Sequence, residues 1–373
     1  MQFLTISILI WHLSTWLLVR NQNFMKRLSI IALSIILLGA GCLGSSSEPN
    51  SADAGVFKSF TSGEEWVQSV LVPTAMGIGT LATTNVLDIT MDPQDNNFLY
   101  ISTRGNGMLY SEDAGASWRQ PRDEALQTGT VNQVTVDPRD VCTVYVAVSS
   151  RLLRSDDCMR TFDSETYVDN RGVNVVRVAV DWYNNRNVWI GLSNGDVLKS
   201  EDSGNTWRTI LNTGNSITGF LISRTDSRQT LVSTSGGGIH KTDNGGDNWK
   251  SLSESMSKFS SADKVYNLIQ SEDSGVVIAA TGYGILRSEN FGESWKAVDL
   301  ITSPGQVQIR AVGMNESNPN TLYYAANSTF YRSLDAGTTW ETERIHSGRT
   351  PTMMLVDPTD PSVLYVAVAY FDD

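Results

Sequence analysis

The sequence has few of the residues that build metal centres. Only three histidines and three cysteines occur in 373 residues. His12, His240 and His346 are scattered, and none of them matches the spacing of zinc ligands. The sequence therefore predicts no metal site, and no motif in it indicates a cofactor.

Basic residues are also scarce, with 28 Lys and Arg against 40 Asp and Glu. Only Arg20, Lys26 and Arg27 precede Cys42, and no acidic residue does. From Cys42 onward the chain thus carries 25 basic and 40 acidic residues, a net charge of −15. This balance excludes nucleic acid as a partner. An anionic membrane surface would also repel this acidic part of the chain, so a lipid would have to hold it at a membrane.

What the sequence does have is an eight-residue phrase, closed by Trp or Phe, that recurs seven times. The closing aromatic residues stand at intervals of 52, 44, 45, 42, 46 and 45 residues. A period in this range, with strands inside it, is typical of propeller blades. The seven copies are Ser59–Trp66, Ser111–Trp118, Ser155–Phe162, Ser200–Trp207, Thr242–Trp249, Ser288–Trp295 and Ser333–Trp340.

Each phrase has the chemistry of a tight hairpin. Asp or Asn at the third position accepts hydrogen bonds from backbone N–H groups ahead of it, and Gly at the fifth takes a positive φ without a Cβ clash. Ser and Thr hydroxyls tie the arms together, and the closing ring buries a flat surface. We assign this structural role, rather than metal binding or acid catalysis, to Asp113, Trp118, Asp157, Phe162, Asp202, Trp207, Asn244, Trp249, Asn290, Trp295, Asp335, Trp340 and Trp66.

These phrases resemble the Asp-box, or BNR, repeat of sialidases, sortilin-type receptors, xyloglucan-hydrolysing glycosidases and photosystem II assembly factors. The pattern is most similar to the assembly-factor and sortilin-type branch. The resemblance covers residues 55–373 and implies a propeller whose Asp boxes lie away from the binding or catalytic face. It leaves the activity itself open.

The residues between the phrases supply the other strands of each blade. Val134–Pro138 ends in an Asp-Pro turn, and Thr143–Val148 follows as a second strand. Glycine-rich hairpins such as Arg104–Gly107 lead to a third strand, and the phrase leads to a fourth. Gly236–Gly238 is such a hairpin and not a phosphate-binding loop, because a strand follows it. The sequence thus predicts an all-β, seven-bladed β-propeller of four-stranded antiparallel blades.

The two ends of residues 55–373 are half-blades. The chain stops at Tyr370–Asp373, after the second strand of a blade. Gly55–Ser59 reads as a third strand, and the phrase through Trp66 leads to a fourth. We expect the N-terminal and C-terminal strands to form the last blade together, which closes the ring and removes exposed sheet edges.

Residues 1–41 read as a signal segment, with translation starting at Met1 or at Met25. Lys26 and Arg27 are followed by the apolar stretch Leu28–Leu38, and the residues up to Cys42 resemble a bacterial lipobox. Cleavage would make Cys42 the lipidated first residue and residues 42–54 a flexible tether. The alternative, an uncleaved signal anchor, keeps the same topology.

Cys142 and Cys158 are the two cysteines that follow Cys42. Cys142 begins a second strand and Cys158 lies in the next phrase, so both flank a hairpin centred near Ser150. A disulfide between them would compensate for Met159 and Phe162, which stand where the other phrases have Gly and Trp, and oxidation is permitted outside the cytoplasm. Two buried thiols are the alternative.

Ligands of propellers sit at the channel mouth. The loops from the fourth strand to the next blade share that face with the hairpins between second and third strands. Candidate residues for this ligand face are Arg104, Asn106, Arg151, Asp169, Arg171, Asn194, Asp196, Tyr283, Gln306, Arg349, Phe371 and Asp372.

The sequence favours a non-catalytic binding or assembly scaffold, tethered to the membrane by lipid in the bacterial cell envelope, for a protein or a glycan. The alternative is an extracytoplasmic glycoside hydrolase that resembles sialidases or xyloglucanases. Such a hydrolase needs two placed carboxylates. A sialidase-like site needs three convergent arginines, and no Arg-Ile-Pro segment of the sialidase kind precedes the first phrase. A third possibility is a structural module of an envelope assembly.

Overall fold

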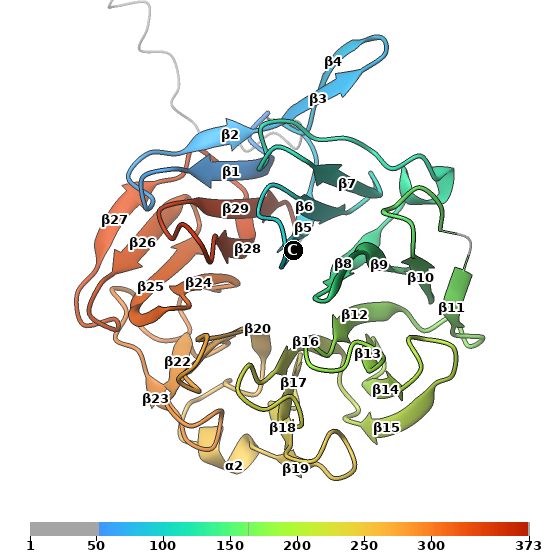
Figure 1. The fold of residues 1–373 in the computed structure, drawn as a ribbon. Helices are drawn as coiled ribbons and strands as arrows, with labels where there is room; N and C mark the ends of the chain where they lie inside the picture. The colour runs from blue at the N-terminus through green and yellow to red at the C-terminus, as the bar shows by residue number, and fades with distance from the viewer. Residues whose placement is uncertain (1–51, 163, 372–373) are drawn as a thin grey trace, which may run out of the picture. The chain divides into compact units, whose positions relative to one another are not determined.

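Strands make up almost all of the regular structure in the computed structural model, which describes residues 52–162 and 164–371. The expected signal segment and most of the expected tether lie outside these residues. The strands form a ring of seven blades around a central axis (Figure 1). Within the described ranges the helical segments are two single turns, η1 (Glu124–Leu126) and α2 (Ser253–Met256).

The seven blades are numbered here in chain order, with the inner strand of each given first. Blades 1 to 3 consist of β5 (Val86–Met91), β6 (Leu99–Thr103), β7 (Met108–Ser111); β8 (Val131–Asp137), β9 (Asp140–Val148), β10 (Arg151–Ser155), β11 (Ser164–Val168); and β12 (Val175–Val180), β13 (Val188–Leu192), β14 (Asp196–Ser200), β15 (Arg208–Asn212). Blades 4 to 6 consist of β16 (Ile217–Ile222), β17 (Thr230–Thr234), β18 (Ile239–Thr242), β19 (Lys250–Ser251); β20 (Val265–Gln270), β21 (Val277–Thr281), β22 (Ile285–Ser288), β23 (Lys296–Ala297); and β24 (Ala311–Asn315), β25 (Asn318–Ala326), β26 (Thr329–Ser333), β27 (Glu341–Arg344).

Blade 7 joins the two ends of the described chain. Its strand order is β2 (Val67–Ser69), β1 (Gly55–Ser59), β29 (Leu364–Ala369) and β28 (Thr350–Val356). Antiparallel pairing places Val56 opposite Ala367, and both side chains are fully buried. The predicted propeller is confirmed, including the closure of its last blade by strands from both ends. In blade 1 the fourth strand is reduced to one bridge between Tyr110 and Arg119.

The second strand of a blade is buried along its whole length. All residues of β6, β13, β17, β21 and β29 are buried, because each blade packs face to face against a blade on either side. Their sequences are rich in β-branched, small and aromatic residues, which suit such a strand. These second strands are therefore the core of the ring, and within the described residues no helical layer covers them.

The inner strands share a feature that the sequence did not indicate. In six of the seven blades, the pairing of the inner strand with the second strand shifts near the start of the inner strand, at its second residue in five blades and at its third in blade 7. Such a β-bulge bends a strand and re-aims its side chains. The bulged residues have no common residue type; they are Leu87, Asn132, Val176, Thr218, Tyr266 and Thr352.

The eight-residue phrases form the hairpins between third and fourth strands. In blade 1 the Asp113 carboxylate accepts hydrogen bonds from the N–H and hydroxyl of Ser117, at 2.8 and 2.6 Å, and from the Ser111 hydroxyl at 2.7 Å. The Gly115 N–H donates to the Ser111 hydroxyl at 2.8 Å. The buried Trp118 indole donates to the backbone of Ser69 in the preceding blade, at 3.1 Å. The phrase therefore shapes its own turn and also fastens neighbouring blades together.

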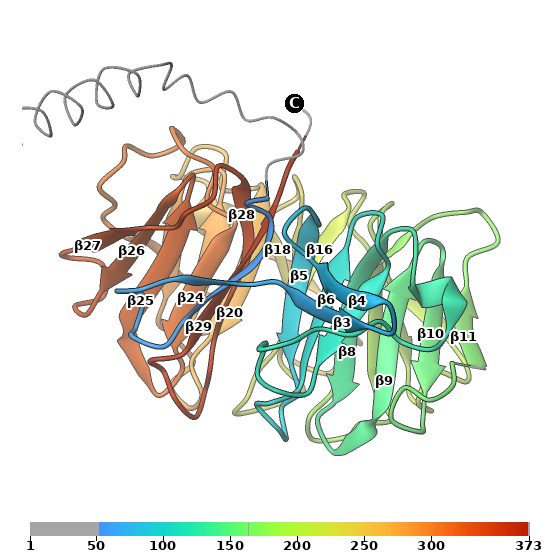
Figure 2. The ribbon, with the colours of Figure 1, turned by 90° about the horizontal axis from the view of Figure 1, so that it is seen from above.

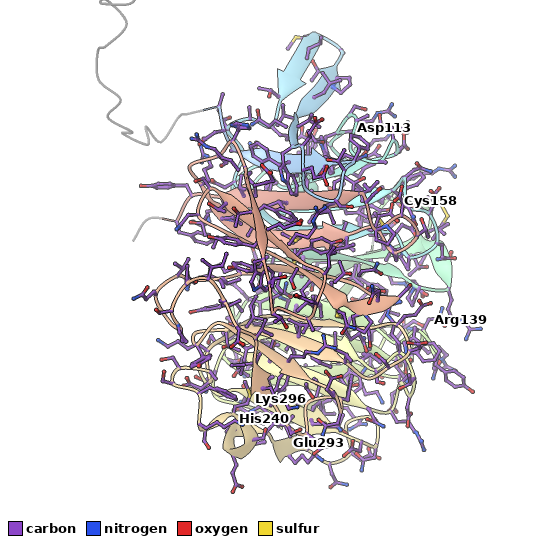
Figure 3. All side chains as sticks on the ribbon, turned by 90° about the vertical axis from the view of Figure 1, so that its left-hand side faces the viewer. Asp113, Arg139, Cys158, His240, Glu293 and Lys296 are labelled. Carbon is purple, nitrogen blue, oxygen red and sulfur yellow. A yellow bond between two sulfur atoms is a disulfide. The ribbon has the colours of Figure 1, made fainter. Side chains whose placement is uncertain are left out.

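Blade 2 departs from this pattern at the fifth position of its phrase. Met159, with a φ of 62°, stands where the other six phrases have Gly. The positive φ of the preceding residue, Cys158, is shared by the fourth residue of every phrase. A non-Gly residue in this region is under backbone strain. The structure places Cys158 in a disulfide with Cys142, with Cα atoms 3.8 Å apart. The side view in Figure 3 shows Asp113, Cys158 and Arg139 along the same face of the propeller, which we call the box face.

A β-hairpin projects from the rim between blade 7 and blade 1. It consists of β3 (Leu71–Thr74) and β4 (Gly77–Thr80). It stands away from the ring in Figure 1, and in the view from above it lies in front of the ring (Figure 2). Met76 and Ile78 are 99% and 84% exposed. The hairpin accounts for the first interval of 52 residues, which is longer than the other five.

Candidate functional site

The channel mouth is built from the hairpins between second and third strands and the loops that lead into the inner strands. Twelve residues were expected there, and the structure brings six of them into two groups. One group surrounds Arg171 in the loop between blade 2 and blade 3. The other surrounds Phe371, just after β29.

Arg171 holds two carboxylates. Its guanidinium lies 2.7 Å from Asp169 Oδ2 and 3.0 Å from Asp196 Oδ2. Asn194 also donates to Asp196 Oδ2, at 2.8 Å, and Tyr167 donates to Asp169 Oδ2 at 3.0 Å. Both carboxylates are buried, whereas the arginine side chain remains 59% exposed. The group has one positive and two negative charges, so it offers little attraction to an anionic ligand.

Hydrogen bonds from Arg171 lower the pKa of Asp169 to about 2, against the opposing effect of burial. Burial acts to raise the pKa of Asp196, but hydrogen bonds from Asn194, Asn212 and Arg171 outweigh it, so that the pKa is lowered. A general acid at neutral pH requires a raised pKa. Neither carboxylate of this group meets that requirement.

The second group contains two arginines on one aromatic ring. The guanidinium carbons of Arg104 and Arg310 each lie 5.1 Å from the centre of the Phe371 ring, and that of Arg310 also lies 4.8 Å from the Tyr266 ring. These distances are those of cation–π contacts. The four residues come from blades 1, 5, 6 and 7, so the group spans the mouth. We call it the arginine–aromatic cluster.

Neither arginine of the cluster pairs with a carboxylate among the described residues. Arg310 donates to Gln308 Oε1 at 3.2 Å, and burial lowers its pKa from the usual arginine value. Arginine stays protonated in proteins, so both groups carry a positive charge. Two cations without a carboxylate partner can bind a carboxylate through bidentate hydrogen bonds.

Arg349 stabilises the closure of the ring and does not form part of the mouth surface. It is 5% exposed, and its guanidinium bonds to Asp53 Oδ1 at 3.1 Å and to Asn85 Oδ1 at 3.0 Å. Asn85 Oδ1 also accepts the N–H of Tyr370 at 2.7 Å. These contacts join segments near both ends of the chain.

The other expected mouth residues stay apart. Arg151 pairs with Glu165 at 2.7 Å, and Tyr283 packs on Phe259 with ring centres 5.1 Å apart. Asn106 and Gln306 are exposed, and Asp372 lies outside the described residues. Tyr283 lines a cavity of about 290 Å³ with the loop after β23.

Sequence reasoning missed three residues of this region. Arg310 lies in a loop that leads into an inner strand. Because such loops were expected on the ligand face, this position could have identified it from the sequence. Tyr266 reaches the mouth because it is the bulged residue of β20. Asp88, which follows the bulge of β5, is 4% exposed, and its Oδ2 atom has no hydrogen-bond partner in the described part of the chain.

Burial raises the pKa of Asp88 to about 6, although the charge of Arg177 and hydrogen bonds from Ile89 and Gln133 act to lower it. The Arg177 guanidinium donates to the carbonyls of Thr218 and Val176, at 2.7 Å each. Asp88 is therefore a buried carboxyl that changes charge near physiological pH.

The described residues 52–162 and 164–371 contain no group of three or more His, Cys, Asp or Glu side chains that could hold a metal ion. No helix within the same ranges is long and apolar enough to cross a membrane.

Comparison with known proteins supports a BNR-type β-propeller. Part of the chain, residues 143–280, matches the family model described as photosynthesis system II assembly factor YCF48. None of the curated proteins compared with the chain matches it.

Solved structures with the same fold come from proteins of different kinds. The Niastella koreensis GH74 enzyme is 15% identical, with a TM-score of 0.63 over 84% of this chain and 53% of its own. YCF48 bound to D1 peptide is 17% identical, with a TM-score of 0.59 over 77% of this chain and 94% of its own. The extracellular domain of a B. thetaiotaomicron one-component system is 16% identical, with a TM-score of 0.57 over 78% and 42%.

The chain spans about half the length of the GH74 enzymes that it matches. At these identities the likeness concerns the fold. A propeller of this type binds a peptide in one neighbour and is extracellular in another.

Proposed function

We propose that the chain is an extracytoplasmic binding or assembly scaffold that holds a segment of another protein at the channel mouth and catalyses no reaction itself. The observation that carries this proposal is the arginine–aromatic cluster. Arg104 and Arg310 present two cations beside Phe371 and Tyr266, and neither cation pairs with a carboxylate of the described residues. A protein segment with a carboxylate next to an apolar side chain fits both features.

The overall charge supports the same ligand chemistry. The chain is acidic, with a net charge of −12. Arg104 and Arg310 at the mouth therefore attract an acidic segment locally, while the rest of the surface repels it. Such an arrangement favours specificity over strong non-specific attraction. The peptide-bound YCF48 structure provides a precedent for peptide binding by this fold.

A phage-displayed peptide selection on the purified full chain tests the proposal. We expect the selected peptides to contain an acidic residue, and we expect the Arg104→Ala/Arg310→Ala double variant to bind them at least about tenfold more weakly. Arg151→Ala is the matched control, because its partner Glu165 already neutralises it. Selected peptides without acidic residues, or equal binding by the double variant, would contradict the proposal.

The hydrolase alternative predicts different results. The two carboxylates that meet at the mouth, Asp169 and Asp196, are both tied to Arg171. We therefore expect no turnover of xyloglucan, sialosides or other envelope and plant polysaccharides by the purified chain. Turnover that is lost in one carboxylate variant would replace the scaffold proposal. Binding of a glycan without turnover would keep the scaffold and change its ligand.

Anchoring at the membrane is part of the same proposal. Lipidation of Cys42 would tether the propeller through residues 42–54 on the outer side of the membrane. In a bacterial host we expect the wild-type chain to incorporate labelled palmitate and to fractionate with membranes. Cys42→Ser should remove the label, and release of that variant from membranes distinguishes lipid anchoring from a signal anchor.

A further inference from the structure

The seams between blades contain a repeated cation. In six of the seven blades, a Lys or Arg immediately precedes the first Ser or Thr of the eight-residue phrase. In four of these blades the cation donates to the carbonyl of the fourth phrase residue in the next blade. The four pairs are Lys58 with Ala114 at 2.7 Å, Arg154 with Ser203 at 2.8 Å, Lys199 with Gly245 at 3.0 Å and Arg332 with Ser62 at 3.3 Å.

An aromatic ring of the second strand supports the same cation. The charged groups of Lys58, Arg154 and Lys199 lie 5.0, 5.8 and 5.2 Å from ring centres of Tyr365, Tyr145 and Trp189. Two of these rings also contribute a hydroxyl, since Tyr365 donates to the Ala114 carbonyl at 2.9 Å and Tyr145 to the Ser203 carbonyl at 3.3 Å. A complete seam thus consists of a cation, a ring and a carbonyl.

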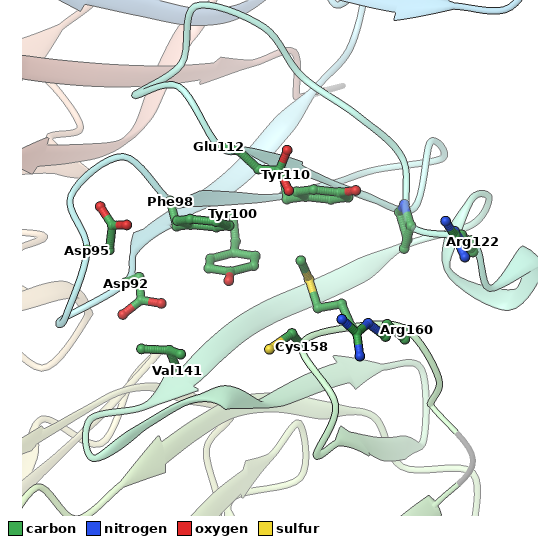
Figure 4. A pocket seen from close by; sticks show the side chains of 12 residues that line it. Asp92, Asp95, Phe98, Tyr100, Tyr110, Glu112, Arg122, Val141, Cys158 and Arg160 are labelled. Carbon is green, nitrogen blue, oxygen red and sulfur yellow. The ribbon is translucent and has the colours of Figure 1, made fainter.

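The seam between blade 1 and blade 2 has the ring but no cation. Tyr100 occupies the position of Tyr145 and Tyr365, and Tyr110 stands where the other blades have Lys or Arg. Tyr100 is 3% exposed, and its hydroxyl makes no hydrogen bond with the described residues. It points into the open space at the seam (Figure 4).

This space is a cavity of about 370 Å³. Tyr100, Tyr110 and Phe98 form aromatic walls, and Asp92 and Asp95 lie together at one end (Figure 4). Burial and then the negative charge of Asp92 raise the pKa of Tyr100, with further contributions from Glu112 and Asp95. At the complete seam of Tyr145, by contrast, Arg154 acts to lower the tyrosine pKa. Around Tyr100 and Asp92 the cavity therefore has the negative field of a seam whose cation is missing.

We propose that this seam binds a lysine side chain of a partner polypeptide, which supplies the missing cation. In the complete seams Lys58 and Lys199 are 6% exposed, so their alkyl stems are buried and their ammonium groups still find carbonyl partners. By analogy, an inserted lysine places its stem along Tyr110 and its ammonium over Tyr100, where it can donate to the Cys158 carbonyl and the Asp92 carboxylate. This site lies on the box face, opposite the mouth, and does not depend on the proposed function of the mouth.

Two arginines restrict what else the ligand can carry. Arg122 and Arg160 line the end of the cavity away from Asp92 and Asp95 (Figure 4). A second cation beside the lysine would meet these guanidinium groups, whereas a carboxylate would pair with them. The site therefore selects a lysine with an acidic neighbour, and it disfavours a polycation.

Calorimetric titration of the full chain with short blocked peptides tests the site. The probe is acetyl-Glu-Gly-Lys-Gly-amide, and the matched control peptide has norleucine in place of lysine, with the same length and no charge. We expect heat of binding with the lysine peptide and at least about tenfold weaker binding of the norleucine peptide. Equal binding of the two peptides, or binding of neither, overturns the proposal.

Substitutions of Tyr110 decide whether the peptide occupies the seam. Tyr110→Lys restores the residue type of the other blades, so we expect it to fill the seam from within, to raise the unfolding midpoint and to abolish peptide binding. Tyr110→Phe leaves the seam empty and should keep the wild-type affinity. Peptide binding by Tyr110→Lys as tight as by Tyr110→Phe contradicts the site. Should Tyr110→Lys fail to fold, Asp92→Asn provides the test, because it removes the charge of a proposed partner of the ammonium group without changing the shape of the side chain, and it should weaken binding several-fold.

Discussion

Aspartate side chains in this propeller differ in pKa according to what surrounds them. In the phrases, Asp202 and Asp335 have a pKa of about 2, chiefly because a backbone N–H four residues ahead donates to each carboxylate. Asp169 reaches a similar value through Arg171. Asp88 has a pKa of about 6 because it is buried. The same residue type therefore shapes turns, joins loops and forms a titratable group in the ring.

Asp88→Asn should stabilise the chain at neutral pH. The pKa of Asp88 is higher in the folded state, at about 6, than in the unfolded state, so ionisation costs stability as pH rises between these two values. Replacing the carboxyl by an amide removes that cost, which we expect to raise the free energy of unfolding by about 1–3 kcal/mol at pH 7.5. Urea unfolding between pH 4 and pH 8 measures the effect.

Asp335→Asn is the control, for which we expect the opposite change in stability. Its folded-state pKa is lowered, so its carboxylate contributes stability above the unfolded-state pKa and loses it as pH falls toward 2. We expect this variant to be less stable than the wild type at pH 7.5. A difference between the wild type and Asp88→Asn that is independent of pH would contradict the assignment to Asp88 ionisation.

Cys142 and Cys158 provide a second test at the level of single residues. Sixteen positions separate them in sequence, and a disulfide closing such a loop contributes about 3 kcal/mol in the chain-entropy model. We expect Cys142→Ser/Cys158→Ser to lower the free energy of unfolding by about this amount. Alkylation of the unreduced, unfolded chain should leave both cysteines unmodified, and labelling of either one shows that they are free thiols.

Among the structural elements, the hairpins of the phrases depend most on glycine. Gly337 has a φ of +93°, and a Cβ atom there would lie 2.2 Å from Val298 Cγ1 in the neighbouring blade. Gly337→Ala should therefore cost about 2–4 kcal/mol of stability through backbone strain and overpacking. Gly275→Ala is the matched control, because Gly275 also has a positive φ, +68°, but has open space around it. The difference between their urea midpoints measures the packing contribution, and no difference argues against tight contact between blades here.

The sequence allowed prediction of elements whose residues repeat. Asp113 and its counterparts set the period, and Asp-Pro turns such as Asp137-Pro138 separate first and second strands as expected. The inner-strand bulges share no residue type, since one has Asn132 and another Tyr266, so nothing in the local sequence marks them. The β3–β4 hairpin was visible only as a long interval, because an insertion changes spacing without a motif of its own.

At the scale of the whole molecule, the candidate sites arise from residues that are far apart in sequence. Arg104 and Phe371 were expected on the ligand face, but their contact through the same ring as Arg310 depends on how the ring closes. The seam at Tyr100 became recognisable only when seven seams could be compared in space. Periodicity thus predicts blades well, whereas sites between blades require the angular order of the ring.

The last prediction concerns the closure of the ring. Blade 7 takes two strands from each end of the described chain, and segments near both ends meet at Arg349 and Asn85. A circular permutant that joins the present ends by a flexible linker and opens the chain between Ser303 and Pro304 has only continuous blades, with no strands shared between its ends. A second permutant, opened between Tyr283 and Gly284, again builds one blade from both ends.

We expect the second permutant to match the wild type in stability and the first to lose about 2–4 kcal/mol, the scale of a cross-link that closes a long loop. The reason is that strand pairing between the ends holds a ring closed with backbone hydrogen bonds, whereas continuous blades meet at the opening only through side-chain packing. Both cuts lie in loops of blade 5 or its connection to blade 6, so local damage is similar. Urea unfolding of the two permutants under identical conditions measures the difference, and equal stabilities would show that face-to-face packing alone closes the ring.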